Sequence, residues 1–525
     1  MAPALNPADF DELIIGTSGN DVLLLPLDQE DSVLFRGRGG NDVFRGGEGD
    51  DGFEGGGGND TFWVSTGNDR FVGGGGINTY NASALNEFAT GRFEFGFGGQ
   101  IKKGNNAGTD TIGNFTLNPN GSIASIMPIQ VIVAPGGRDD NLVDLSASGA
   151  QNGVAFANVD LKSNSIEVVD TIGGGSFTVT AQNFTDITGT NLDDDLRGDN
   201  QANEIRGEQG NDVIRGRGGA DELFGNGGND DLRGGGGNDV LRGGGGNDTL
   251  NGGNGNDDAR GGNGDDVFIG SSGDDAFQGN GGFDTADYSN LGAPISFNQG
   301  GRIEKGVGGA LGLDQLGTFD PFSFVEKVIG DPTQLNTVDN SGGFNISVVV
   351  DLVGGADGPF VTATVEVPFQ IGGTAFPVGT NFTVEIENFT NIVGTGFADD
   401  LMGDGDANEI IGGAGEDLLK GRGGNDILAG GLDADEIRPG GGLDTVVLTD
   451  QFSTDDVFGF NVTDDMLLIS IAGVSGVAQI ENGSDLDIVV DDGGIADGAV
   501  LATLVNRGGQ AGNVDVDFGD FPLVA

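Results

Sequence analysis

An apolar residue recurs at every ninth position through the middle of the chain. Residues 189–287 divide without a gap into eleven nonapeptides, of which residues 234–242 (Gly-Gly-Gly-Gly-Asn-Asp-Val-Leu-Arg) are a clear copy. Position 1 is Gly in all eleven, position 6 is Asp in ten, and position 8 is always apolar. A disordered linker rich in Gly and Asp needs no apolar residue at a fixed period. The pattern therefore predicts a folded repeat.

The nonapeptide predicts one turn and one strand. Six residues rich in Gly and Asp form a turn that needs positive φ, which Gly adopts without steric cost. Three residues follow as a short strand whose middle side chain points inward. Two nonapeptides then complete one flat coil, and successive coils stack at the strand spacing of about 4.8 Å. The expected fold is all-β, a parallel β-roll or β-helix solenoid.

Stacking of this kind aligns the position-6 side chains in a row along each edge of the roll. Two neighbouring carboxylates repel strongly unless a cation lies between them. Calcium suits such a gap, because it accepts carboxylate and carbonyl oxygens at about 2.3–2.6 Å. Glycine turns leave their carbonyl groups uncovered. We therefore expect Ca²⁺ along both edges.

Two further blocks follow the same frame. Residues 16–24 fit it, residues 37–81 contain five nonapeptides in register, and residues 394–447 contain six. Asn78, Asn203 and Asn408 replace the position-6 Asp, which leaves their own sites open. The candidate calcium ligands are the position-6 aspartates of all three blocks: Asp21, Asp42, Asp51, Asp60, Asp69, Asp194, Asp212, Asp221, Asp230, Asp239, Asp248, Asp257, Asp266, Asp275, Asp284, Asp399, Asp417, Asp426, Asp435 and Asp444.

The nonapeptide resembles the glycine-rich GGxGxDxUx repeat of RTX proteins, which is a calcium-binding β-helix repeat. The resemblance covers residues 16–81, 189–287 and 394–447, somewhat under half of the chain. It implies that calcium is bound by the position-6 Asp and by turn carbonyls of stacked repeats. It does not specify an activity, because the same roll accompanies proteases, lipases, toxins, epimerases and surface proteins.

The segments between the repeat blocks are rich in Val, Ile, Phe and Thr, which predicts short strands and turns. They resemble the spacers of cyanobacterial RTX surface proteins, including oscillin-type fibril and S-layer proteins. The resemblance rests on residues 287–291 (Asp-Tyr-Ser-Asn-Leu), residues 325–330 (Val-Glu-Lys-Val-Ile-Gly) and the Asn-Phe-Thr stretches.

The two long spacers share landmarks. Residues 97–104 (Phe-Gly-Gly-Gln-Ile-Lys-Lys-Gly) match residues 299–306 (Gln-Gly-Gly-Arg-Ile-Glu-Lys-Gly), and residues 183–190 match residues 388–395. The chain is therefore interpreted as a tandem duplication of a roll and a spacer. The spacers either continue the solenoid with longer, metal-free coils or form separate sandwiches. The predicted segments are an N-terminal lead or cap (1–15), roll 1 (16–81), spacer 1 (82–188), roll 2 (189–287), spacer 2 (288–393), roll 3 (394–447) and a C-terminal cap with a secretion signal (448–525).

Composition excludes several classes of function. The formal charge of −59 makes nucleic acid and anionic membranes poor partners, and the short apolar runs predict no membrane insertion. Cysteine and histidine are absent, which excludes disulfides, thiolate metal sites, His-based triads and zinc-protease motifs. No G-x-S-x-G elbow is present, which disfavours an RTX lipase.

The chain termini bear on export. Residues 1–12 have neither a basic region nor an apolar core, so they do not form a Sec signal peptide. Residues 518–525 place an acidic residue before an apolar tail, which resembles the uncleaved C-terminal signal of type I secretion substrates. We therefore expect the type I secretion machinery as a partner and an extracellular or cell-surface location.

The leading functional hypothesis is a secreted structural protein of the cell surface. It would fold on calcium and self-assemble into a homo-oligomer or filament, such as a fibril, sheath or layer, with surface polysaccharide as a further possible partner. We expect no enzymatic activity. One alternative is a soluble calcium-dependent adhesin, for which residues 114–116 and 381–383 offer Asn-x-Thr triplets that could carry sugars. The other is a polysaccharide-acting enzyme, because carboxylate pairs hydrolyse glycosidic bonds without histidine.

Overall fold

The structure is a computed structural model. It describes residues 5–26, 28–83, 93–96, 100–103, 109–112, 116–117, 123–125, 131–135, 141–146, 155–170, 176–298, 301–316, 325–341, 346–355, 358–365, 369–371, 374–376, 381–449, 453–461, 463–470, 477–482, 485–490, 500–505 and 516–518. The end of the predicted secretion signal, residues 519–525, lies outside the described residues, as does most of the Asn-x-Thr triplet at 114–116. No helix in the described ranges is long and apolar enough to cross a membrane.

The chain forms two compact units, Met1–Val267 and Phe268–Ala525. Nearly all described elements are strands, which confirms the all-β prediction. In each unit, successive repeat strands alternate between two sheets, here called sheet A and sheet B, and each strand pairs in parallel with the strand two elements later. One coil therefore uses two nonapeptides, and the fold is the predicted parallel solenoid.

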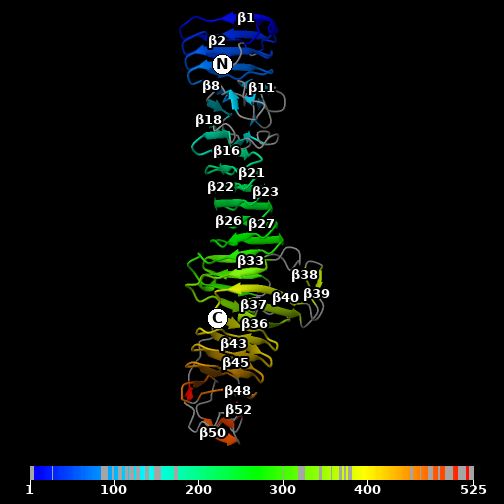
Figure 1. The fold of residues 1–525 in the computed structure, drawn as a ribbon, viewed down its shortest axis with the longest axis vertical. Coiled ribbons are helices and arrows are strands. Elements are labelled where there is room, and N and C mark those ends of the chain that lie inside the picture. Colours follow the sequence, from blue (N-terminus) through cyan, green and yellow to red (C-terminus); the bar gives the residue numbers. More distant parts are fainter. Residues whose placement is uncertain are drawn as a thin grey trace. The chain divides into compact units, whose positions relative to one another are not determined.

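Roll 2 in the first unit shows the stacking most regularly (Figure 1). Partners in neighbouring coils lie eighteen residues apart, as in Leu223 with Leu241 and Leu232 with Leu250. Most of these strands are six residues long instead of the expected three, because the first three turn residues of the next nonapeptide also join the ladder. Sheet A contains β21 (Glu204–Gln209), β23 (Glu222–Gly227), β25 (Val240–Gly245) and β27 (Asp258–Asn263), and sheet B contains β20 (Asp195–Arg197), β22 (Val213–Gly218), β24 (Asp231–Gly236) and β26 (Thr249–Asn254).

The position-8 side chains form a thin core between the two sheets. In roll 2, Leu196, Ile205 and Leu241 are completely buried, as the inward orientation of position 8 requires. Roll 1 fills the same position with aromatic rings, which stack between coils. The ring centroids of Phe44 and Phe62 lie 5.1 Å apart, with an interplanar angle of 10°. Each coil thus buries little more than one side chain per strand, so the fold depends strongly on its backbone ladder.

Each spacer continues the solenoid through a three-stranded antiparallel excursion in sheet B. In spacer 1, β14 pairs in parallel with β18, which is followed by β17 and β16 in antiparallel order, and β16 pairs in parallel with β20 of roll 2. The strands are β14 (Val131–Val133), β16 (Ala155–Asp160), β17 (Ser165–Asp170) and β18 (Ser176–Gln182). The described residues therefore place spacer 1 within the solenoid and do not form a separate sandwich.

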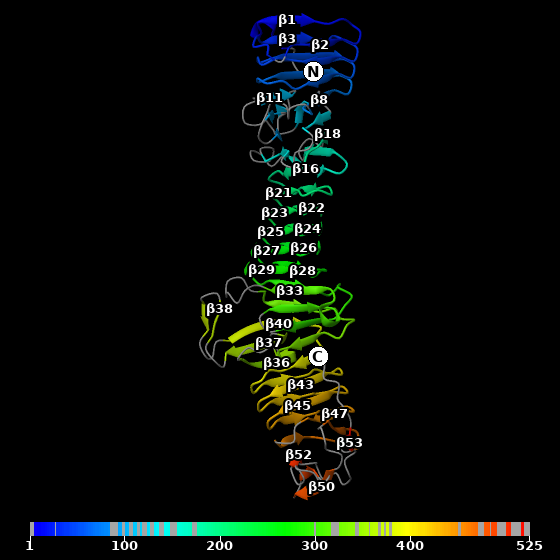
Figure 2. The ribbon, with the colours of Figure 1, turned by 180° about the vertical axis from the view of Figure 1, so that it is seen from behind.

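Spacer 2 repeats this topology in the second unit, where β36, β37 and β40 lead into roll 3 (Figure 2). There β34 pairs in parallel with β40, β40 and β36 flank β37 in antiparallel order, and β36 pairs in parallel with β42. The strands are β34 (Lys327–Ile329), β36 (Ile346–Gly355), β37 (Gly358–Val365), β40 (Asn381–Glu387) and β42 (Asp400–Met402). The shared topology supports the tandem duplication inferred from the sequence.

An arginine of the roll holds each excursion in place. Arg217 forms two hydrogen bonds of 2.8 Å with Asp160 of β16, and Arg422 forms bonds of 2.6 and 3.0 Å with Asp351 of β36. Both arginines occupy position 2 of a nonapeptide with positive φ, 83° and 73°. The bond from Arg217 lowers the pKa of Asp160 to about 2. Each excursion is thus tied to its roll by a bidentate ion pair.

The C-terminal segment contains the same excursion a third time. There β48 (Asp455–Phe458) pairs in parallel with β52 (Val500–Val505), and β52 is followed by β51 (Asp485–Val490) and β50 (Val477–Asn482) in antiparallel order. Among the described strands, β50 pairs with β51 alone. One edge of β50 therefore has no partner strand in the described part of the chain.

The described part of the predicted N-terminal lead lies beside the first coils. The backbone N–H of Leu5 donates to Glu54, and Phe10 packs against Gly52. Residues 12–15 are themselves the first strand of sheet A, β1 (Glu12–Ile15), and pair in parallel with β3 (Val33–Arg36). The parallel ladder thus includes residues 12–15, which directly precede the first nonapeptide.

Gly237, at position 4 of its nonapeptide, lies where two neighbouring coils approach too closely for a larger residue. Gly237 has a φ of 136°, and a Cβ atom on it would lie 1.5 Å from the carbonyl oxygen of Gly219 in the preceding coil.

We expect Gly237→Ala to lower the free energy of unfolding by about 1–3 kcal/mol or more, measured by urea denaturation in saturating calcium. Gly236→Ala is the matched control, because a Cβ there would meet nothing nearer than 3.9 Å. Equal stability of the two variants would contradict this packing.

Candidate metal centre

The predicted ligands form continuous rows along the edges of the rolls. In roll 2, the backbone N–H of Asp212 donates to Oδ1 of Asp230, and that of Asp230 donates to Oδ1 of Asp248, each at 2.8 Å. The same bond links Asp221 to Asp239 in the other row. Each carboxylate after the first in such a row is therefore fixed by the coil before it, eighteen residues away in the sequence.

These carboxylates are buried. Asp212, Asp239 and Asp417 are each about 1% exposed, and of the predicted ligands only Asp21, in the first coil, is half-buried. The rows in the first unit are Asp21, Asp42, Asp60 and Asn78; Asp51 and Asp69; Asp194, Asp212, Asp230, Asp248 and Asp266; and Asn203, Asp221, Asp239 and Asp257. Those in roll 3 are Asp399, Asp417 and Asp435, and Asn408, Asp426 and Asp444. Asp275 and Asp284 are buried in the second unit.

Four further aspartates extend these rows, and the sequence period did not reveal them. Asp110 accepts from Asp69 and Asp314 from Asp275, while Asp455 accepts from Asp435 and Asp465 from Asp444. The intervals within these pairs are 41, 39, 20 and 21 residues. The nonapeptide frame has been lost at these positions, so only the three-dimensional ladder identifies them.

The second carboxylate oxygen gives the strongest evidence that a cation binds in these rows. Oδ2 of Asp212, Asp230 and Asp239 is buried and has no hydrogen-bond partner among the described residues. The same holds for Oδ2 of Asp42, Asp60, Asp221, Asp248, Asp417, Asp426 and Asp444. Burial of an ionised oxygen without a partner is strongly unfavourable. Each of these oxygens therefore calls for a positively charged ligand.

Position 1 shows where oxygens converge. A Cβ atom on Gly234 would lie 2.2 Å from Oδ2 of Asp239 and 2.6 Å from the carbonyl oxygen of Gly252 in the next coil. The missing side chain of Gly234 thus leaves a small space that faces a carboxylate and a backbone carbonyl. The described residues contain no group of three or more acidic side chains that could hold a metal by themselves. A cation at this edge must therefore combine carboxylate with carbonyl oxygens, and Ca²⁺ accepts both.

Burial and mutual repulsion raise the pKa values of these carboxyl groups. Burial is the main reason that the pKa of Asp212 and that of Asp417 rise to about 8. The negative charges of Asp194 and Asp230 raise the pKa of Asp212 further, against the hydrogen bond from Asp194, which lowers it. Burial likewise raises the pKa of Asp248 to about 7. Without a cation, the rows therefore favour protonation near neutral pH.

Two of the departures from Asp stand at the start of a row. The Nδ2 group of Asn203 donates to the carbonyl oxygen of Thr185 at 2.7 Å, and that of Asn408 donates to Thr390 at 2.9 Å. A carboxylate could not donate these bonds. Each Asn thus bonds to the preceding spacer through its amide and to the first carboxylate of the row through its backbone N–H, and it adds no charge. Asn78 accepts from the N–H of Asp60 through Oδ1, as an Asp would.

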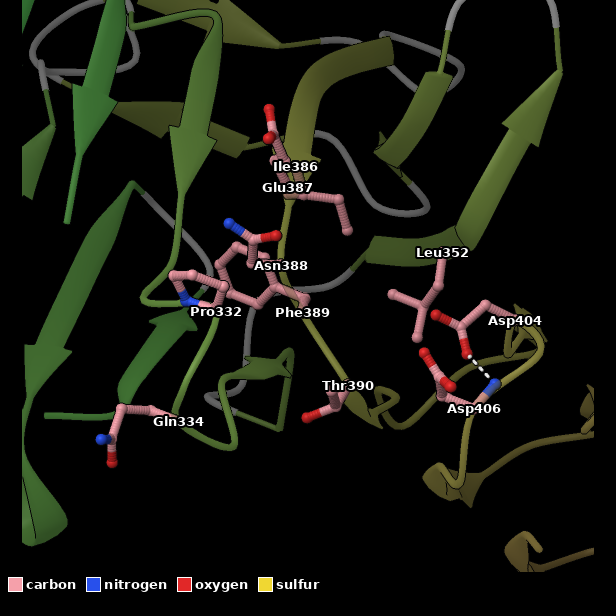
Figure 3. A pocket seen from close by; sticks show the side chains of 10 residues that line it. All are labelled: Pro332, Gln334, Leu352, Ile386, Glu387, Asn388, Phe389, Thr390, Asp404 and Asp406. Carbon is pink, nitrogen blue, oxygen red and sulfur yellow. Dashed lines mark hydrogen bonds between the residues drawn. The ribbon is translucent and has the colours of Figure 1, made fainter. Parts of the chain in front are cut away.

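A separate hollow lies in the second unit, between spacer 2 and roll 3 (Figure 3). Its volume is about 340 Å³, and Glu387, Asp404 and Asp406 contribute carboxylates to its lining. Phe389 and Asn388 belong to one of the Asn-Phe-Thr landmarks. Asn388 has a φ of 63°, and its side chain donates to the carbonyl oxygen of Gly330 at 3.0 Å. This landmark therefore forms a structural turn beside the hollow.

The family comparison agrees with the repeat pattern of the rows. The model of the RTX calcium-binding nonapeptide repeat matches residues 34–62, 46–80, 188–223, 224–259, 252–286, 393–428 and 411–446. Among solved structures, an extracellular lipase, LipA from Serratia marcescens, matches with 14% sequence identity and a TM-score of 0.18. That match covers 61% of this chain and 38% of the lipase chain, so the chain spans well under half of the lipase. No curated protein matches the sequence.

An Asp→Asn change within a row tests the assignment of the ligands. Asp239→Asn retains an oxygen that accepts the N–H of Asp221 but removes the charge. We expect it to lower the number of calcium ions bound by the folded protein and to raise the calcium concentration needed for folding. Native mass spectrometry and circular dichroism measure these two effects. Asp231→Asn is the matched control, because Asp231 pairs with Arg233 on the surface. An unchanged ion count in Asp239→Asn would remove Asp239 from the ligands.

The pKa values predict how pH affects the metal-free protein. The pKa values of Asp212, Asp221 and Asp248 are raised from 3.8 to about 8, 7 and 7, so the folded chain holds protons that the unfolded chain releases. This contribution to stability is complete below about pH 4 and is lost as pH rises through about 7 to 8. In chelator, circular dichroism should therefore show more β structure at pH 5.5 than at pH 8. Saturating calcium should abolish this loss of β structure at pH 8. An increase in β structure from pH 5.5 to pH 8 in chelator would contradict the prediction.

Proposed function

Because the chain carries RTX calcium-binding nonapeptide repeats, we propose that it is a secreted structural protein of the cell surface. It folds when it binds Ca²⁺ and assembles into a fibril, sheath or surface layer. The proposed role is not catalytic. The buried rows of carboxylates support the role of calcium, since their second oxygens need a cation before the thin core can hold the coils together.

A dependence of folding on calcium also agrees with the proposed route of export. In a cytoplasm with little calcium, the carboxylate rows repel one another and the glycine-rich turns are costly to order. The chain would remain unfolded and could pass through the type I secretion machinery. Outside the cell, calcium would bind to the rows and supply much of the free energy of folding.

The strands at the two ends of sheet B in the described residues, β2 (Val22–Leu24) and β50, are the observation that supports the proposal of assembly. In the two spacers, the equivalent strands β16 and β36 pair in parallel with β20 and β42, the first sheet B strands of the rolls that follow. In the described residues, β50 has no such partner. An unpaired strand edge is a template for pairing with another chain.

The first coil of roll 1 offers the surface against which β50 of another chain would pair. The N–H of Thr17 donates to Oδ2 of Asp21 at 2.6 Å, as Thr190 does to Asp194 and Thr395 to Asp399 at the start of the other rolls. Asp194 and Asp399 also accept a bond of 2.6 Å from the backbone N–H groups of Ala157 in β16 and Val348 in β36. No described excursion strand lies beside Asp21.

The strand that follows Asp21, β2 (Val22–Leu24), pairs in the described residues with β4 (Val43–Arg45) alone. Its outer side chains, Val22 and Leu24, are 68% and 47% exposed. Parallel pairing of β50 of one chain with β2 of another would recreate the junction between spacer and roll. Such a contact is heterologous, so it propagates into a filament unless the rotation closes a ring. Bound calcium lowers the repulsion between chains whose formal charge is −59.

The hollow beside Phe389 favours one second candidate, a soluble calcium-dependent adhesin that binds a glycan. The carboxylates of Glu387, Asp404 and Asp406 in its lining are acceptors that suit the hydroxyl groups of a sugar. Surface polysaccharide remains a proposed partner in either case. The two candidates differ in whether the folded chain associates with itself.

Self-association can be tested at the edge of β2 that faces away from β4. The N–H of Leu25 donates to β4, so by alternation the N–H of Leu24 faces away from β4. Leu24→Pro therefore removes a donor from that edge only, whereas Leu24→Ala keeps that donor. We expect wild-type protein and Leu24→Ala to form large assemblies in millimolar calcium, and Leu24→Pro to remain a folded monomer. Light scattering and circular dichroism report the two properties. A folded wild-type monomer at high concentration would reject the structural role and leave the adhesin, which a glycan array would then test.

A further inference from the structure

Two lysines are completely buried at the boundaries between a roll and the spacer that follows it. Lys103 ends β10 (Gln100–Lys103), and Lys305 ends β32 (Arg302–Lys305). Both side chains are 0% exposed. Lysine is almost never fully buried unless it is paired. These two positions therefore need a specific partner for the ammonium group.

The partners of Lys103 are three oxygens of roll 1 and spacer 1. Its Nζ atom lies 2.6 Å from Oδ1 of Asp110, 2.7 Å from the carbonyl oxygen of Ser65 and 3.3 Å from Oδ2 of Asp69. Both carboxylates are completely buried as well. The ammonium group thus sits between two carboxylates and one turn carbonyl.

The two carboxylates are consecutive members of a row. The N–H of Asp51 donates to Oδ1 of Asp69, and the N–H of Asp69 donates to Oδ1 of Asp110, each at 2.9 Å. Asp110 therefore takes the place of the next position-6 Asp. The ammonium group of Lys103 has the same kinds of ligand, carboxylate and turn carbonyl, that the rows offer to a cation elsewhere. The hydroxyl group of Tyr80 donates to Oδ2 of Asp110 at 2.6 Å and satisfies its remaining oxygen.

The second spacer repeats the arrangement with its own residues. Nζ of Lys305 lies 3.1 Å from Oδ2 of Asp275 and forms an ion pair with Asp314. The N–H of Asp275 donates to Oδ1 of Asp314 at 3.0 Å, and the hydroxyl group of Tyr288 donates to Oδ2 of Asp314 at 2.8 Å. A cluster of one lysine, two aspartates and one tyrosine thus occurs once in each unit.

We propose that Lys103 and Lys305 are tethered cations that fill the last cation position of a row and so end the calcium row at the spacer. Each ammonium group balances carboxylate charge at a position where the coil widens from 18 to 41 or 39 residues. The boundary between roll and spacer then requires no calcium ion of its own. This inference rests on the proposed binding of calcium by the other members of the rows.

The shared landmark agrees with this role. In Gln-Ile-Lys-Lys-Gly and Arg-Ile-Glu-Lys-Gly, the residue directly before the buried lysine is Lys102 in one copy and Glu304 in the other. Lys102 is exposed, and Glu304 is only half-buried. The buried lysine is the charged residue that both copies share.

Removal of the ammonium group should create a new calcium site. Lys103→Ala leaves the two carboxylates and the Ser65 carbonyl group facing an empty space, which Ca²⁺ accepts as ligands. We expect Lys103→Ala and Lys305→Ala each to bind one more calcium ion per chain than wild-type protein, and the double variant two more. Native mass spectrometry of folded protein in millimolar calcium gives the count. Lys102→Ala, on the same strand but exposed, should leave the count unchanged.

A charge-restoring variant covers the case in which Lys103→Ala does not fold. Lys103→Ala with Asp110→Asn removes one carboxylate together with the ammonium group, and we expect it to fold with the wild-type ion count. Failure of this double variant, or a Lys103→Ala protein that folds at the wild-type calcium concentration without an extra ion, would overturn the proposal. The number of calcium ions bound by wild-type protein distinguishes the proposed function from the proposal of tethered cations. If wild-type protein binds no calcium, the proposed function fails; if it binds calcium and the variants gain none, only the tethered cation fails.

Discussion

The structure depends on one repeated interaction, a backbone N–H of one coil that donates to the carboxylate of the next. This bond draws a charged side chain into the edge of the roll and fixes one of its oxygens, as between Asp230 and Asp248. The other oxygen of Asp248 is buried and has no hydrogen-bond partner among the described residues. The ladder therefore creates the need for a cation with the same bonds that align the coils. Under the proposed function, folding and calcium binding are therefore two descriptions of a single equilibrium.

At the ends of the rows, amide or ammonium groups of the protein stand where a carboxylate would otherwise need a cation. Asn203 and Asn408 begin their rows with a neutral amide that donates to a carbonyl group of the preceding spacer. Lys103 and Lys305 stand at the other boundary with a positive charge of their own. The spacers also leave the strict coil through an antiparallel excursion, which Arg217 and Arg422 tie to the adjoining roll. At each boundary between a roll and a spacer, protein groups thus take the place that we propose for calcium within the roll.

The sequence predicted the repeat, the direction of each side chain and the rows, because a period of nine residues determines all three. Leu241 and Asp239 are buried as their positions in the nonapeptide require. The strands are longer than predicted, since glycines that were assigned to turns also join the ladder. Asp110 and the role of Lys103 could not be predicted, because chain segments of irregular length bring them to the row. The roles of the predicted ligands in binding calcium stay predictions.

The alternation of successive nonapeptides between two sheets also limits how such a gene can change length. Loss or gain of a single nonapeptide would transfer every later strand to the opposite sheet, so that an excursion such as β36 would meet the wrong face of its roll. Loss or gain of eighteen residues would leave all later pairings in register. Recombination between copies of the repeat is therefore tolerated in whole coils, and the rolls are expected to differ among relatives by multiples of two nonapeptides.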